Sequence, residues 1–228
     1  MKRSFINQKI NEALLFFEDM NFKLPPWGYW SKSHWKQHRK DCTEIFTNGL
    51  GWDLTDFGSG DYSKYGLLLF TLRNGNLKMD RKSYSEKIMI VEEGQLTPMH
   101  FHWSKMEDII NRGGGNLIFQ LYPSNTKGGF ERHEIEVSLD GVRKKIQPGT
   151  ELILEPGTSI TLYPELYHSF YGERGSGKVL VGEVSSVNDD HRDNHFNPPV
   201  GRFPSIEEDE APTHLLVGDY ASFIQPDK

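Results

Sequence analysis

The sequence predicts a mainly β fold, a sandwich or barrel of short strands that follows a helical N-terminal region. From Gly66 onward, short segments rich in Leu, Ile, Val, Phe and Tyr are separated by turn signals such as Asn74-Gly75-Asn76 and Asp140-Gly141. Helical patterns do not separate these segments, as they would in a parallel α/β sheet. The predicted strands are Gly66–Leu72, Ser85–Glu92, Asn116–Tyr122, Ile135–Leu139, Thr150–Leu154, Ser159–Tyr163 and Lys178–Val184.

The region before these strands predicts two helices. Residues 4–20 carry apolar side chains at helical spacing, with Ser4 as a candidate N-cap, and Pro25-Pro26 ends this region. A second short helix is expected from Ser31 to about Arg39. The expected apolar stripe of the first helix consists of Phe5, Ile10, Leu14, Leu15 and Phe17. An aromatic cluster before and within the second helix is expected to pack the helices onto the larger body: Trp27, Tyr29, Trp30 and Trp35.

These patterns divide the chain into three parts. Residues 1–60 form an N-terminal helical extension packed on the body, and residues 61–187 form the β-barrel itself. Residues 188–228 are rich in Pro, Asp and His, which is typical of a long ordered loop or arm and not of more sheet. We expect this arm to cover the barrel.

Composition excludes several classes of protein. The 228 residues include 26 basic and 32 acidic side chains, a net charge of −6, which argues against a nucleic-acid surface. No apolar run approaches the ~20 residues of a membrane helix, and no apolar signal core follows Met1, so we expect a cytoplasmic protein. Cys42 is the only cysteine. A bound metal must therefore be held by histidines and carboxylates.

Two histidines and a glutamate predict a metal site. His100 and His102 are two residues apart, so on a strand both imidazoles point to the same face. Glu107 follows beyond a short turn that can fold the next strand back alongside. Three such ligands can meet one ion at about 2.0–2.2 Å each. The spacing therefore predicts that this hairpin-like unit binds a metal.

His168 is the best candidate for a fourth ligand. It lies in an apolar segment after the Pro156-Gly157 turn, which predicts an interior side chain. A hydrogen-bonded core histidine would give the same pattern. The segment 189–195 offers a second interpretation, because it alternates aspartates with His191 and His195 and could itself be a metal loop. His133 stands beside charged residues and could be exposed.

The pattern Gly94-x5-His100-x-His102-x4-Glu107-x6-Gly114 resembles the first cupin motif. The stretch from Gly157 to His168 resembles the second cupin motif, although Pro164 and His168 are one residue closer together than the proline and histidine of that motif. Thr97-Pro98-x-His100-x-His102 looks like the motif of sugar-isomerising cupins. The whole chain is similar to the D-lyxose ketol-isomerase family. The blocks that carry this similarity are Leu24-Pro25-Pro26-Trp27, Met99 to Gly115, Tyr163 to Phe170, Gly182-Glu183-Val184-Ser185 with Asn188-Asp189-Asp190, and Arg202-Phe203-Pro204 with Glu207-Glu208-Asp209-Glu210.

This resemblance implies a cupin fold, which is a double-stranded β-helix or jelly-roll barrel, for residues 61–187. It implies one divalent ion per subunit, Mn²⁺ first, with Co²⁺, Fe²⁺, Ni²⁺ or Zn²⁺ as alternatives. It also implies the interconversion of D-lyxose with D-xylulose, and of D-mannose with D-fructose. The partner is then a small free monosaccharide, and the expected assembly is a homodimer. Neither a nucleic acid nor a membrane is expected as a partner.

Isomerisation moves a proton between C2 and C1 of the sugar, so one group must remove and return it. Lys105 stands between the histidine pair and Glu107, and it is a candidate for catalysis and for substrate binding unless it is a solvated turn residue. Glu183 shares a strand face with two valines, and if that face is interior it is a buried carboxylate with a raised pKa. Glu207 is a third catalytic candidate if the acidic run around it caps the barrel mouth. The candidates for binding sugar hydroxyls are Lys105, Asp189 and Asp193.

Two other interpretations remain open at the level of sequence. One is another metal-dependent cupin enzyme, chiefly a dioxygenase or a phosphosugar isomerase. The other is a non-enzymatic sugar-binding cupin, against which an intact four-ligand set argues. Turnover without O₂ separates an isomerase from an oxygenase.

Overall fold

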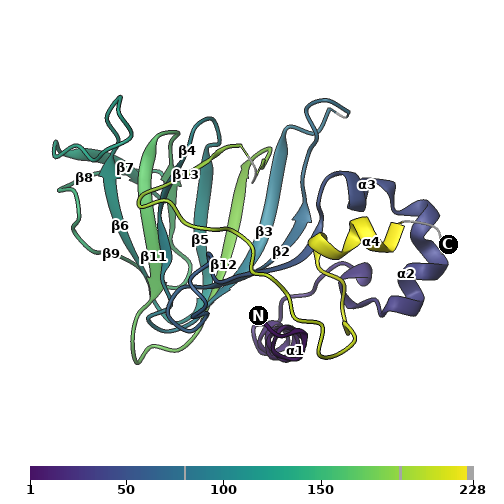
Figure 1. The fold of residues 1–228 in the computed structure, drawn as a ribbon. Coiled ribbons are helices and arrows are strands. Elements are labelled where there is room, and N and C mark those ends of the chain that lie inside the picture. The colour runs from purple at the N-terminus through teal and green to yellow at the C-terminus, as the bar shows by residue number, and fades with distance from the viewer. Residues whose placement is uncertain (80, 190–191, 225–228) are drawn as a thin grey trace.

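The strands form two antiparallel sheets that face each other in a computed structural model describing residues 1–79, 81–189 and 192–224 (Figure 1). The larger sheet runs, in order, β1 (Gly51–Thr55), β2 (Leu67–Arg73), β3 (Tyr84–Val91), β12 (Val179–Ser186), β5 (Glu107–Gly114), β10 (Ser159–Leu162), β7 (Ile135–Leu139) and β8 (Val142–Ile146). The smaller sheet runs β13 (Asn194–Phe196), β4 (Thr97–His102), β11 (Leu166–Gly172), β6 (Leu117–Pro123) and β9 (Leu152–Leu154). Neighbours in each sheet are mostly distant in sequence, as in a jelly roll. The predicted mainly β fold of the cupin type is confirmed.

The main hydrophobic core lies between the two sheets. On β12 the side chains alternate, because successive residues of a strand point to opposite faces. Val179 and Val181 face this core, whereas Leu180 belongs to a second apolar cluster on the outer face. Residues from both sheets fill the space between them: Met89, Ile109, Ile160, Leu117, Phe119, Leu121 and Phe170. Glu183 is two residues beyond Val181 and therefore points toward the interior as well.

The outer face of the larger sheet is covered by α1 (Arg3–Asp19), which lies across β2, β3 and β12 (Figure 1). Its buried side chains contact Leu68, Phe70 and Leu180 of those strands. The buried apolar residues of α1 are Ile6, Ile10, Ala13 and Phe17. The predicted stripe is wrong at Leu15, which is 65% exposed because it points away from the sheet.

The remaining helices gather at one end of the molecule (Figure 1). The predicted second helix is confirmed as α2 (Lys32–His38), and α3 (Thr43–Thr47) and α4 (Tyr220–Ile224) lie near it. Three short 3₁₀ helices link these elements: Pro26–Tyr29, Arg39–Asp41 and Val217–Asp219. Trp35 packs against Leu215 and Tyr220 from the C-terminal segment, so helices are not confined to the N-terminal region.

The predicted strands correspond to β2, β3, β6, β7, β9, β10 and β12, with ends that differ by up to two residues. The sequence interpretation missed β1, which precedes Gly66 and is only five residues long. It also missed β13, a three-residue strand inside the C-terminal arm that exists because it pairs with β4. The arm is therefore partly sheet. Among the described residues no helix is long and apolar enough to span a membrane.

We predict that Ile10→Ala lowers the free energy of unfolding by about 2–5 kcal/mol, because Ile10 is fully buried between α1 and the sheet. The matched control is Leu15→Ala on the exposed side of the same helix, which should change that free energy by less than about 0.5 kcal/mol. Urea denaturation of both variants measures the difference. Equal losses would contradict the packing of α1 described here.

Candidate metal centre and proton-transfer site

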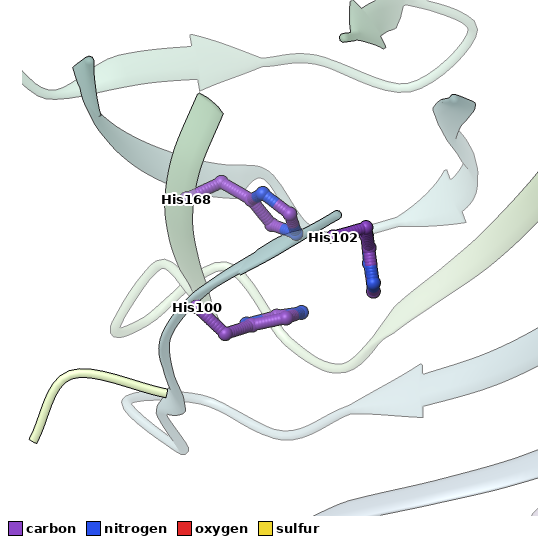
Figure 2. Close-up of side chains that lie close together, drawn as sticks. All are labelled: His100, His102 and His168. Atoms are coloured by element: carbon purple, nitrogen blue, oxygen red, sulfur yellow. The ribbon is translucent and has the colours of Figure 1, made fainter. Parts of the chain in front are cut away.

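Three histidine rings converge inside the barrel from two neighbouring strands. His100 and His102 lie on β4, and His168 lies on β11, where it is paired directly with His100. Figure 2 shows the three rings turned toward one common space. One ring nitrogen from each histidine lies within 4.8 Å of the others, and all three side chains are buried. The pairing of β4 with β11 thus joins residues that are 66 or more positions apart in sequence.

Backbone carbonyls hold two of these rings in orientation. His100 Nδ1 lies 2.8 Å from the carbonyl oxygen of Pro98, and His168 Nδ1 lies 3.0 Å from that of Leu166. A ring whose Nδ1–H donates to a carbonyl presents an unprotonated Nε2 to the interior. This is the tautomer that a metal ligand requires.

Glu107 begins β5 in the opposite sheet and reaches the same space. Its Oε1 lies 3.2 Å from Nε2 of His102 and 3.2 Å from Nε2 of His168. Burial opposes ionisation of this carboxyl, but Lys105 and the two imidazoles outweigh burial and hold the pKa of Glu107 well below its ordinary value. The four residues therefore combine three imidazoles with one carboxylate.

The donor set fits a divalent cation. Among the described residues, His168 Nε2 is buried without a hydrogen bond of good geometry, although Glu107 is near. A buried polar atom without a partner is costly, and a cation would satisfy this nitrogen. Burial, together with the neighbouring imidazoles or Lys105, lowers the pKa values of His100 and His102, which keeps both neutral. Neutral imidazoles and a carboxylate are ligands for first-row transition ions.

A chain of buried ion pairs continues from Glu107. Lys105 Nζ lies 2.6 Å from Glu107 Oε2 and 2.9 Å from Glu183 Oε1. Lys87 Nζ lies 3.1 Å from the same Glu183 oxygen. All four side chains are at most 6% exposed. Lys105 is thus an interior residue, not a solvated turn residue.

Lys87 was missing from the sequence-derived candidates. It lies on β3 directly opposite Glu183 of β12 in the strand register. The one feature of the sequence that could have identified it as a site residue is its position within an apolar strand, Ser85 to Val91. A lysine at an inward-facing position of a core strand needs a buried acidic partner.

The expected raised pKa of Glu183 is wrong. Burial favours the neutral acid, but Lys105 and Lys87 outweigh burial and lower the pKa of Glu183 below its ordinary value. Burial likewise opposes the charge of Lys105, whereas Glu107 and Glu183 raise the pKa of its ammonium group. Glu183 is therefore an ionised carboxylate that accepts hydrogen bonds from Lys105 and Lys87.

The two oxygens of Glu183 differ in their hydrogen bonds. Oε1 accepts from Lys105 at 2.9 Å, from Lys87 at 3.1 Å and from the Ser185 hydroxyl at 3.1 Å. From the residues that the structure describes, Oε2 accepts only a long bond of 3.4 Å, which Lys87 donates. Oε2 is consequently the oxygen better able to accept a proton.

Asp193 supports the turn that carries Lys105. Its carboxylate accepts hydrogen bonds from the backbone N–H groups of Ser104 and Lys105, at 2.8 and 2.9 Å, and from the Ser104 hydroxyl at 2.7 Å. These bonds occupy the carboxylate that the sequence suggested for sugar binding. The Asp189 side chain is exposed, and its carbonyl accepts from the N–H groups of Arg192 and Asp193.

The alternative metal loop around residues 189–195 falls partly on Asp190 and His191, which lie outside the described residues. His195 packs its ring against Phe101 and Trp103, and it does not belong to the histidine cluster. His133 is exposed, as its charged surroundings suggest.

Glu207 is not brought to this site. Its side chain is exposed, and its backbone pairs with Met1 and Arg3. The expectation that the acidic run caps the barrel mouth is wrong, because this run binds the beginning of α1. Asp209 accepts from the N–H and the hydroxyl of Ser4, so Ser4 is held by the arm and is not the N-cap.

The cavity around these residues has a charged side and an apolar side. Leu67, Met89 and Phe170 line it together with the histidines and Glu183. The lining also includes three residues that the sequence did not indicate: Asn194, Phe196 and Arg202. Phe196 stacks on the His100 ring at 5.1 Å, so the arm contributes to the wall of the site.

Known proteins resemble this chain over most of its length. The family model described as D-lyxose isomerase matches residues 1–220. A D-lyxose/D-mannose isomerase of Serratia proteamaculans is 50% identical over 98% of this chain and 100% of its own, and one of Escherichia coli O157:H7 is 49% identical over the same shares. Among solved structures, an L-ribose isomerase of Geodermatophilus obscurus has a TM-score of 0.62 at 16% identity, covering 91% of this chain and 98% of the other. That likeness supports the fold.

Proposed function

Because this chain belongs to the D-lyxose isomerase family, a family of sugar isomerases, we propose that it interconverts D-lyxose with D-xylulose and D-mannose with D-fructose. D-lyxose and D-mannose share the configuration at C2 and C3 and differ by one carbon. A site that accepts the open chain of one sugar therefore also has the stereochemistry for the other. Free monosaccharides carry no charge, which fits a cavity whose lysines are already paired with carboxylates.

One divalent ion, held by His100, His102, His168 and Glu107, is part of the proposal. The observation that carries it is the buried histidine cluster, in which His168 Nε2 has no hydrogen bond of good geometry among the described residues. When bound, such an ion supplies positive charge that favours the open-chain sugar with negative charge on O1 and O2. We propose Mn²⁺ because oxygen and imidazole ligands suit it, with Co²⁺, Fe²⁺, Ni²⁺ or Zn²⁺ as substitutes.

Glu183 is the proposed proton carrier. Its carboxylate is ionised, lines the cavity and has one oxygen that is nearly free of donors. It takes the proton from C2 and returns it to C1 on the same face of the sugar. Lys105 is protonated and cannot act as the base, so its proposed role is to donate hydrogen bonds to sugar oxygens while it orients Glu183.

The proposal also includes a homodimer, as the family resemblance implies, and a cytoplasmic location. Exposed apolar side chains beside the turn that carries Lys105 support association between copies. Trp103, Met106 and Tyr163 are 43–51% exposed, and Met106 and Tyr163 are the chain neighbours of the paired residues Glu107 and Leu162.

We predict that His102→Ala loses most of its bound metal by elemental analysis while it keeps a β-rich circular dichroism spectrum. EDTA should abolish turnover of the wild type, and Mn²⁺ should restore it. His195→Ala is the matched control, because His195 lies near the site without joining the cluster, and it should retain the metal. Full metal occupancy in His102→Ala would refute the ligand assignment.

We predict that Mn²⁺-loaded enzyme converts D-lyxose and D-mannose to their ketoses, read by chromatography, with or without O₂. Glu183→Gln should lower kcat by about 10²–10⁴, because the amide cannot accept a proton. Metal content should stay at the wild-type level, since Glu183 is not a proposed ligand.

Glu136→Gln on β7 controls for the amide substitution, because Glu136 is an exposed residue far along the same sheet. It should leave kcat unchanged. Failure of the fully loaded wild type to convert either sugar would reject the proposed activity. Oxygen-dependent consumption of a substrate would favour the dioxygenase interpretation instead.

A further inference from the structure

A basic hollow of about 720 Å³ lies at the helical end of the molecule, away from the histidine cluster. It is formed by α2 and the 3₁₀ turn after it, by the first residue of α1, and by the C-terminal segment with α4. Nothing in the proposed isomerisation uses this hollow. Its size lies within the roughly 300–1,000 Å³ of small-molecule sites in proteins.

Four exposed or half-exposed cations line one wall of this hollow: Lys32, Lys36, Arg39 and Lys40. Lys32 and Lys36 are four residues apart on α2 and therefore share one side of the helix. Lys36, Arg39 and Lys40 make no ion pair with any residue in the described ranges. Their positive charges thus face the hollow without a partner among the residues that the structure describes.

The acidic residues of the hollow are already bound by Arg3. Its guanidinium donates to both oxygens of Glu208, at 2.9 and 2.7 Å, and to both oxygens of Asp219, at 3.0 and 2.7 Å. Asp219 also accepts from the N–H of Leu216. Among the described residues, the lining therefore holds five cations and two carboxylates, a net charge of +3, whereas the whole chain has a net charge of −6.

We propose that this hollow binds a small phosphorylated molecule. Clustered lysine and arginine side chains bind phosphate oxygens through charge-assisted hydrogen bonds. Pro212, Leu215 and Phe223 form an apolar part of the lining, which fits an uncharged body attached to the phosphates. The concave shape and the small number of cations favour a metabolite over a nucleic acid, which needs a longer basic surface.

The hollow is lined by residues from the beginning and from the end of the described residues, for example Arg3 and Phe223. A ligand that binds only the folded protein shifts the folding equilibrium toward it. Occupancy of the hollow should therefore raise the temperature of unfolding. This inference does not depend on the proposed isomerase activity.

Isothermal titration calorimetry of the full-length protein, with excess Mg²⁺, tests the proposal with two probes. Adenosine diphosphate represents nucleoside phosphates, and fructose 1,6-bisphosphate represents sugar phosphates; adenosine is the uncharged control. We expect one probe or both to bind at one molecule per chain, with an affinity that falls as NaCl increases. Adenosine should not bind at comparable concentration.

The double variant Lys36→Glu/Lys40→Glu should weaken binding by about tenfold or more, because two attractions become repulsions. The matched control is Lys78→Glu/Lys144→Glu, which makes the same charge change at exposed positions elsewhere and should bind like the wild type. Thermal unfolding without ligand verifies that both variants fold, and Arg39→Ala replaces the double variant if it does not. Equal affinities in variant and control would overturn the proposal. So would binding of neither probe, binding of several molecules per chain, or competition of the probe with D-lyxose.

Discussion

The buried chain of ion pairs from Lys87 through Glu183 and Lys105 to Glu107 is the interaction on which the site depends. Charges inside a protein are tolerated only when each has a close partner, and removing one partner is costly. The register that sets Lys87 opposite Glu183 and the turn that carries Lys105 are therefore both needed for a stable interior. The same pairing keeps Glu183 ionised and Lys105 protonated, so stability and the proposed acid–base function rest on one network.

The C-terminal arm supports this network from outside the barrel. Asp193 fixes the turn that carries Lys105, and β13 pairs with β4 beside the histidines. Further along, Glu208 and Asp209 bind Arg3 and Ser4 at the beginning of α1. The arm thus connects the first helix to the wall of the site.

Local sequence patterns were sufficient for the parts of the site that lie close together in the chain. The two-residue spacing of His100 and His102 and the short turn to Glu107 predicted a shared face, and the rings do converge. The pKa direction of Glu183 could not be predicted, because Lys87 is 96 residues away and meets it only through strand pairing. An acidic run such as Glu207 to Glu210 gives no local sign of the helix it binds. The division of the chain at residues 60 and 187 stays a prediction.

The central claim is that the ionised Glu183 carboxylate carries the proton between C2 and C1. Turnover of D-lyxose deuterated at C2, in ordinary water, measures this directly by following the label with NMR. A carboxylate that exchanges protons with solvent predicts that part of the deuterium appears in the water and that the rest reaches C1 of D-xylulose. Complete retention of the label at C1 would contradict the claim and favour a hydride shift that needs no side-chain base.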